Sequence, residues 1–159
     1  MNEDIIFLKE EFPKLLDQLH PDLEAQWGVM RPQHMVEHLS MVMMISNGRA
    51  QATPFYEEEK LQKNYTFIIE NKNLLKRNTK APILLTEAPP LHFKSMVEAK
   101  GKLLKNMSLF FEHFNENPEI KYMHPAFGLL NFDEWAYFHA IHSKYHLEQF
   151  GLYKGGTML

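Results

Sequence analysis

Apolar residues recur three and four positions apart in several stretches of the chain, which is the spacing of a helix that buries one face. The pattern predicts helices at residues 4–19, 32–46, 96–114 and 132–150. Pro13 lacks an N–H donor and clashes with the preceding turn, so it should kink or restart the first helix. Residues 122–130 are expected to form a loop, and no convincing pair of strands is predicted. The pattern therefore favours an all-α fold.

Capping signals support two of these helices. Ser95 to Glu98 reads S-x-x-E, a capping box that opens the third helix, and Asn131 to Glu134 is a looser version that opens the last one. The second helix should end at Asn47-Gly48. The stripe expected to be buried on the third helix is Val97, Gly101, Leu104, Ser108 and Phe111.

A long, mostly polar connection joins the second and third helices, at residues 49–94. A structureless connection of this length is unusual in a compact domain, so we expect a short helix near Leu61 and Ile68. The proline-bracketed "KAPILLTEAPP" (80–90) should be extended. Such a crossover would let the second and third helices run parallel, as in some four-helix bundles. With 159 residues, one domain spanning 1–159 is expected.

Composition narrows the classes of function. The net charge is −3 and no dense Lys/Arg cluster is present, so a nucleic-acid partner is not expected. No apolar run approaches the ~20 residues of a membrane span, and the acidic start "MNEDIIFLKE" is unlike a secretory signal. There are no cysteines, which excludes disulfides and thiolate ligands. We expect a cytoplasmic protein with no membrane partner.

The nine histidines are unusual, and two pairs are spaced i, i+4: His34/His38 and His142/His146. Random placement would give about 0.5 such pairs, and residues at this spacing share one face of a helix. Apolar neighbours turn His142, His146 and His38 inward, where an imidazole needs partners for both nitrogens. One explanation is a metal ion shared by these three histidines, and the alternative is separate core histidines with ordinary hydrogen bonds.

Other polar residues near this face have less defined roles. His139 could be a fourth ligand, a hydrogen-bonding partner of a ligand, or a packing residue. Gln149 faces inward three residues after His146 and is expected to orient a ligand or substrate. His124 could line the pocket or stabilise a turn. Glu37 and Glu148 lie about 100° or more around their helices from the histidines, so neither is a good general base.

Two segments resemble the DinB/YfiT-like superfamily of metalloenzymes: "WGVMRPQHMVEHLSM" (27–41) and "HPAFGLLNFDEWAYFHAIHSKYHLEQFG" (124–151). The resemblance is to a branch with W-G-x-M, H-P-x-F-G and H-x-x-x-H-L-x-Q-F-G segments. Two positions depart from the family pattern, because Tyr145 stands where histidine is common and Arg31 where Ser or Thr caps the helix.

The resemblance implies a four-helix bundle with a three-histidine site for a divalent metal, matched here by His38, His142 and His146. Zinc or nickel is expected first, with iron or manganese as further options. A small-molecule hydrolase is the first expectation for function. The alternatives are a thiol S-transferase or isomerase that uses a low-molecular-weight thiol, and a metal-binding bundle without catalysis. The resemblance and the ten methionines also suggest a homodimer.

Overall fold

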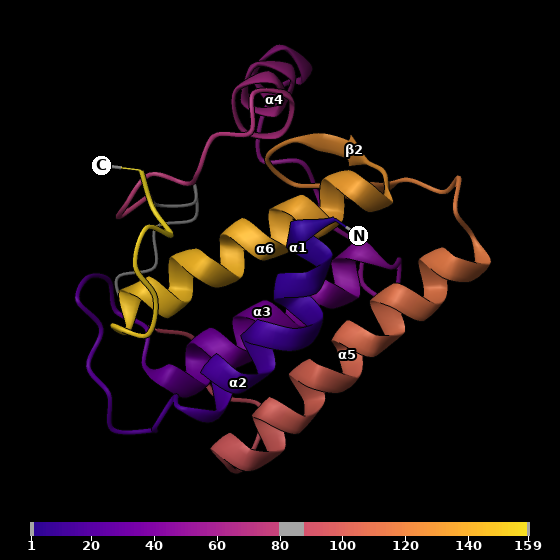
Figure 1. Ribbon diagram of the computed structural model, residues 1–159. Coiled ribbons are helices and arrows are strands. Elements are labelled where there is room, and N and C mark those ends of the chain that lie inside the picture. Colours follow the sequence, from indigo (N-terminus) through magenta and orange to yellow (C-terminus); the bar gives the residue numbers. More distant parts are fainter. Residues whose placement is uncertain (1, 80–87, 159) are drawn as a thin grey trace.

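The computed structural model describes residues 2–79 and 88–158 and is mostly helical (Figure 1). This agrees with the all-α expectation. In chain order the elements are α1 (Glu3–Ile6), η1 (Phe7–Glu11), α2 (Phe12–Asp17), α3 (Pro32–Ser46), α4 (Glu58–Tyr65), η2 (Thr66–Glu70), α5 (Met96–Glu116), β1 (Tyr122–His124), β2 (Gly128–Leu130) and α6 (Phe132–Gln149). The boundaries of α3, α5 and α6 lie within two residues of those predicted.

The first predicted helix is continuous from α1 through η1 to α2, with a wider π-helical turn at η1. Pro13 follows this turn directly and stands near the start of α2, where its missing N–H costs little. The backbone N–H of Phe12 donates to the carbonyl of Phe7, which closes the wider turn. The α-helical hydrogen-bonding pattern therefore restarts at α2, as one of the two expected outcomes, although the chain stays helical through the junction.

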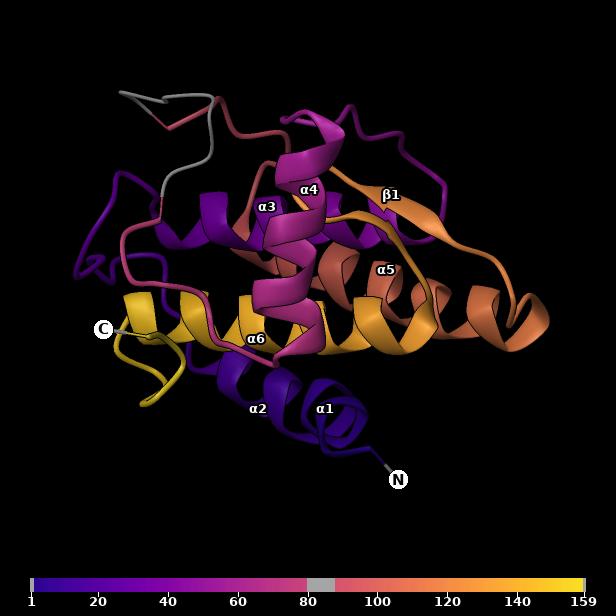
Figure 2. The same cartoon turned by 90° about the horizontal axis from the view of Figure 1, so that it is seen from above.

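The long helices lie side by side, with α3 and α5 running in the same direction and α6 running against them (Figures 1 and 2). Hydrogen bonds mark the parallel contact. Asn106 Nδ2 donates to Ser40 Oγ at 2.8 Å, and Gln33 Nε2 donates to the Phe93 carbonyl at 2.8 Å. The crossover contains the expected short helix as α4 and η2, which crosses the other helices in Figure 2. Residues 80–87 of the segment expected to be extended lie outside the described residues.

The expectation of a loop at residues 122–130 is wrong, because β1 and β2 form a short antiparallel hairpin. Tyr122 pairs with Leu130 and His124 with Gly128. The turn follows from the sequence "HPAFG": Pro125 suits an early turn position, and Gly128 adopts a left-handed φ of +83°. This turn signal was present in the sequence, but each strand is too short to show a clear alternation.

The stripe predicted for α5 is wrong at Val97, Gly101 and Ser108, which are exposed, whereas Leu104 and Phe111 are partly buried against the core. Val97 is 82% exposed, and nothing lies within 4 Å of a Cβ placed on Gly101. The buried face consists of Met96, Ala99, Leu103, Asn106, Met107, Phe110 and Phe114. It includes a polar residue because Asn106 is hydrogen-bonded to Ser40 and also accepts from Arg49 Nη1 at 2.9 Å.

Helix α6 occupies the centre of the fold. Most of its residues are buried, including Trp135 and Ala140 at 0% exposure. A histidine on this helix is therefore enclosed whichever way it points, and its polar atoms need partners inside the protein. Within the described residues, no helix is long and apolar enough to cross a membrane.

Candidate metal centre

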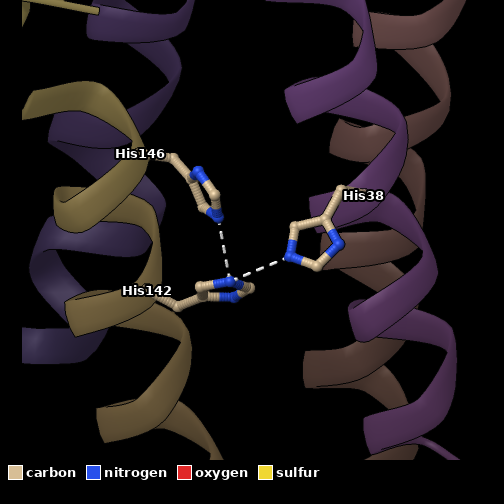
Figure 3. Close-up of side chains that lie close together, drawn as sticks. All are labelled: His38, His142 and His146. Atoms are coloured by element: carbon tan, nitrogen blue, oxygen red, sulfur yellow. Dashed lines mark hydrogen bonds between the residues drawn. The ribbon is translucent and has the colours of Figure 1, made fainter. Parts of the chain in front are cut away.

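Three histidines converge between α3 and α6 (Figure 3). His38 comes from α3, and His142 and His146 come from successive turns of α6. The Nε2 atom of His142 lies 3.0 Å from Nε2 of His38 and 3.1 Å from Nε2 of His146. One ring nitrogen from each residue lies within 4.8 Å of the others. The structure thus brings together the three residues that the sequence singled out.

Local structure explains the placement of the pair on α6. Asn131 Oδ1 accepts from the backbone N–H of Glu134, and Glu134 Oε2 accepts from the backbone N–H of Asn131. This capping box fixes the start of α6, and the i, i+4 spacing then stacks His142 and His146 on one face. On α3, Pro32 stands at the first helical position, and His38 lies on the side that meets α6.

The cluster is enclosed on the α6 side and more open on the α3 side. His142 is 8% exposed and His146 is 5% exposed, whereas His38 is only partly buried. The His142 ring stacks on Phe138, with centroids 4.9 Å apart and an angle of 26° between the planes. An apolar wall therefore lies beneath the cluster, on the side of α6.

Protons alone cannot satisfy the contacts at His142. A neutral ring nitrogen carries either one hydrogen or one lone pair, so Nε2 can take part in one linear hydrogen bond. Two other ring nitrogens lie at hydrogen-bonding distance from this atom. However the protons are distributed over three neutral rings, only one of the two contacts of His142 Nε2 can be a linear hydrogen bond. A cation removes this conflict, because two nitrogens bound about 2.1 Å from one ion lie about 3.0–3.4 Å apart.

The protonation state also suits a metal. Burial lowers the pKa of His38 to about 4. Burial, and repulsion between the protonated forms of His146 and His38, lower the pKa of His146 to about 3, against a smaller opposing effect of its hydrogen bond to Gln149. The pKa of His142 lies well below its ordinary value, first because of burial and then because of repulsion from His146 and His38. All three rings are neutral at pH 7, which is the form that binds metal ions.

Gln149 contacts the cluster directly. Nδ1 of His146 lies 2.8 Å from Gln149 Oε1, and the Gln149 side chain is buried. Its amide nitrogen donates to the carbonyl of Trp27 at 2.8 Å. Sequence spacing indicated the contact with His146, but nothing in the spacing indicated Trp27. For Nδ1 of His142, no hydrogen-bonding partner is found among the described residues.

His139 and His124 do not join the three-histidine group. His139 Nε2 is 2.8 Å from Ser46 Oγ, and its ring stacks on Trp135, so it packs in the core. His124 Nδ1 accepts from the backbone N–H of Ala126 at 3.0 Å, which stabilises the hairpin turn. Burial lowers the pKa of both imidazoles to about 3, with repulsion from His139 adding to the effect on His124.

The remaining candidates are engaged elsewhere. His34 Nδ1 accepts from the backbone N–H of Arg31 at 3.2 Å and lies outside the cluster. Glu37 accepts the backbone N–H groups of His92 and Phe93 at 2.8 and 2.9 Å. These bonds outweigh partial burial and lower the pKa of the Glu37 carboxyl.

Glu148 pairs with Arg77, with Oε1 and Nη2 3.0 Å apart. Neither this carboxylate nor that of Glu37 belongs to the three-histidine group, and Oε2 of Glu148 has no hydrogen-bond partner among the described residues. Comparison with protein-family models, curated proteins and solved structures finds no match for this chain. The resemblance to the DinB/YfiT-like superfamily therefore stays a prediction.

Proposed function

We propose that this chain is a metal-dependent hydrolase of small molecules, with a DinB/YfiT-like four-helix bundle and one divalent ion held by His38, His142 and His146. The convergence of three Nε2 atoms, with two contacts that protons cannot both satisfy, carries the proposal. The donors are all imidazole, which suits zinc, nickel and iron(II). Because manganese prefers carboxylates, zinc or nickel is our first choice.

The shape of the cluster favours a reactive site over a closed structural one. Three protein ligands leave coordination positions open, and a divalent ion bound in this way lowers the pKa of a bound water toward neutrality. The partial exposure of His38 leaves an approach for a small substrate, while His142 and His146 are shielded. The Phe138 ring beneath His142 excludes water from the inner side of the site.

A thiol S-transferase or isomerase is the second candidate. It is favoured by the placement of both neighbouring carboxylates: Glu37 is held by backbone N–H groups, Glu148 Oε1 pairs with Arg77, and neither residue belongs to the three-histidine group. A metal can activate a small thiol as its thiolate without a protein base. A bundle that binds metal without catalysis is the third candidate.

Metal content of purified variants tests the site itself. His142→Ala should lose most of the bound metal in elemental analysis, because two imidazoles hold a divalent ion far more weakly than three. His34→Ala is the matched control, since His34 shares a helical face with His38 but contacts Arg31. Equal metal content in wild type and His142→Ala would contradict the proposal.

Cobalt(II) substitution separates the three candidate functions. A thiolate-to-cobalt charge-transfer band on addition of 2-mercaptoethanol would favour the thiol-dependent reaction. A pH-dependent visible spectrum without that band would favour a bound water and the hydrolase. A spectrum that responds to neither would indicate a saturated ion and a structural role.

A further inference from the structure

Gln149 joins the metal cluster to the turn at residues 26–28. On one side its Oε1 lies 2.8 Å from Nδ1 of His146, and on the other its Nε2 lies 2.8 Å from the carbonyl oxygen of Trp27. The Gln149 side chain is 4% exposed, so water offers little competition for either bond. The side-chain amide is thus held between a ligand of the cluster and a segment that begins far away in the sequence.

The partners decide which ring nitrogen of His146 carries the proton. A backbone carbonyl can only accept, so the Gln149 atom facing Trp27 must be the NH₂ group. The atom facing His146 is then the amide oxygen, which also can only accept. Nδ1 of His146 must therefore carry the hydrogen, and Nε2 must carry a lone pair. That lone pair faces the cluster, where Nε2 of His142 lies 3.1 Å away.

We propose that Gln149, fixed by the Trp27 carbonyl, is a positioning residue that holds His146 in the Nδ1–H tautomer and keeps its Nε2 available to a metal ion. The proposal on affinity rests on the proposed function, because it concerns the same cluster. The proposal on the tautomer concerns the metal-free protein and does not depend on it.

The turn is well anchored for this purpose. The backbone N–H of Gln26 donates to the Gln149 carbonyl at 2.8 Å, and Trp27 Nε1 donates to the Tyr145 hydroxyl at 3.0 Å. The guanidinium of Arg77 lies 4.7 Å from the centre of the Trp27 ring. These contacts hold the Trp27 carbonyl in place against the last turn of α6.

Gly28 is required for the close approach of this turn. Its φ is +80°, a left-handed conformation that favours glycine. A Cβ at this position would lie 2.9 Å from Nε2 of Gln149, which is too close. Any other side chain would push the amide away from the Trp27 carbonyl and so disturb the hydrogen bond to His146.

Losing the amide should free the proton of His146. Without an acceptor at Nδ1, the hydrogen can move to Nε2, where Nε2 of His142 can accept it. The lone pair then no longer faces the cluster. Groups that orient a metal-binding histidine in this way typically contribute 10–100-fold in metal affinity.

Nitrogen-15 NMR of the histidine rings in metal-free protein at pH 8 tests the tautomer, because protonated and bare ring nitrogens resonate in separate regions. Wild type should show His146 protonated at Nδ1, and Gln149→Leu should show the proton at Nε2 or shared between the two. Gln149→Glu should keep the Nδ1–H form, because either state of the carboxyl group presents an acceptor. Gln33→Leu is the matched control: Gln33 also donates to a distant backbone carbonyl, but it does not contact the cluster.

Zinc affinity of the same variants then tests the consequence. Gln149→Leu should bind Zn²⁺ 10–100-fold more weakly than wild type, Gly28→Ala should also weaken Zn²⁺ binding, and the control Gln33→Leu should stay near wild type. Thermal unfolding confirms that each variant folds. A wild-type proton on Nε2, or a Gln149→Leu protein that keeps the Nδ1–H form, would overturn the proposal. Failure of wild type to bind Zn²⁺ would instead refute the proposed metal site.

Discussion

Acidification should unfold the metal-free protein within a narrow range of pH, because the fold encloses several neutral histidines. Burial lowers the pKa of His124, His139 and His146 to about 3, whereas an unfolded imidazole titrates near 6.5. Between these values the unfolded chain binds protons that the folded chain does not. The free energy of unfolding therefore keeps its full value, as far as these histidines are concerned, above pH 6.5, and it falls progressively as the pH decreases toward 3.

The size of the effect follows from the same shifts. At pH 5 an imidazole that stays neutral in the fold destabilises it by about 2 kcal/mol relative to pH 7. His124, His139 and His146 together account for about 6 kcal/mol on this basis, and His38 and His142 act in the same direction. The free energy of unfolding of ordinary domains is about 5–15 kcal/mol. The metal-free protein should therefore lose much of its stability, or unfold, between pH 6 and pH 5.

Urea unfolding followed by far-UV circular dichroism at a series of pH values from 8 to 5 measures this loss. His139→Gln removes one buried imidazole. It should reduce the difference in unfolding free energy between pH 7 and pH 5 by about 2 kcal/mol. His20→Gln is the control and should leave the change as it is, because His20 is exposed and hydrated in both states. If the unfolding free energy of wild type fell by less than about 2 kcal/mol between pH 7 and pH 5, the reasoning would be refuted, because the buried rings would then accept protons within the fold.

Three further predictions concern stability. Saturation with Zn²⁺ at 100 times its dissociation constant should raise the unfolding free energy of wild type by about 2.7 kcal/mol in the same urea assay, and the gain should vanish in His142→Ala. Gly48→Ala should lower the melting temperature, costing at least about 1–2 kcal/mol, because φ is +76° and the new Cβ would clash with Tyr122; an unchanged melting temperature would contradict the geometry. Gly101→Ala should instead stabilise by up to about 1 kcal/mol, since this helical position has open space around it, and a loss of stability would show that the space is not available.

The sequence alone was sufficient for features that depend on local geometry. Helical periodicity placed the long helices to within a few residues, and the capping box at Asn131 marked the start of α6. The i, i+4 spacing was enough to put His142 and His146 on one face, because that relation is set within a single helix. The same local geometry brought Gln149 to His146 at i+3.

Features that depend on contacts between elements required the tertiary structure. The buried face of α5 was misjudged because Asn106, polar in the sequence, finds Ser40 and Arg49 across the α3 contact. The hairpin was missed because each strand is too short for its pattern to be distinguished from a loop.

The choice of the α3 histidine in the cluster also required the tertiary structure. His34 and His38 form a pair as regular as the one on α6, and spacing alone does not select between them. The packing of α3 against α6 places His38 next to His142, whereas His34 Nδ1 accepts from the backbone N–H of Arg31 at the start of α3. The Trp27 carbonyl that orients Gln149 is likewise a through-space contact between distant segments, which no spacing along the chain records. Sequence periodicity reports which way a side chain faces from its own helix, whereas only the packed fold determines what it meets.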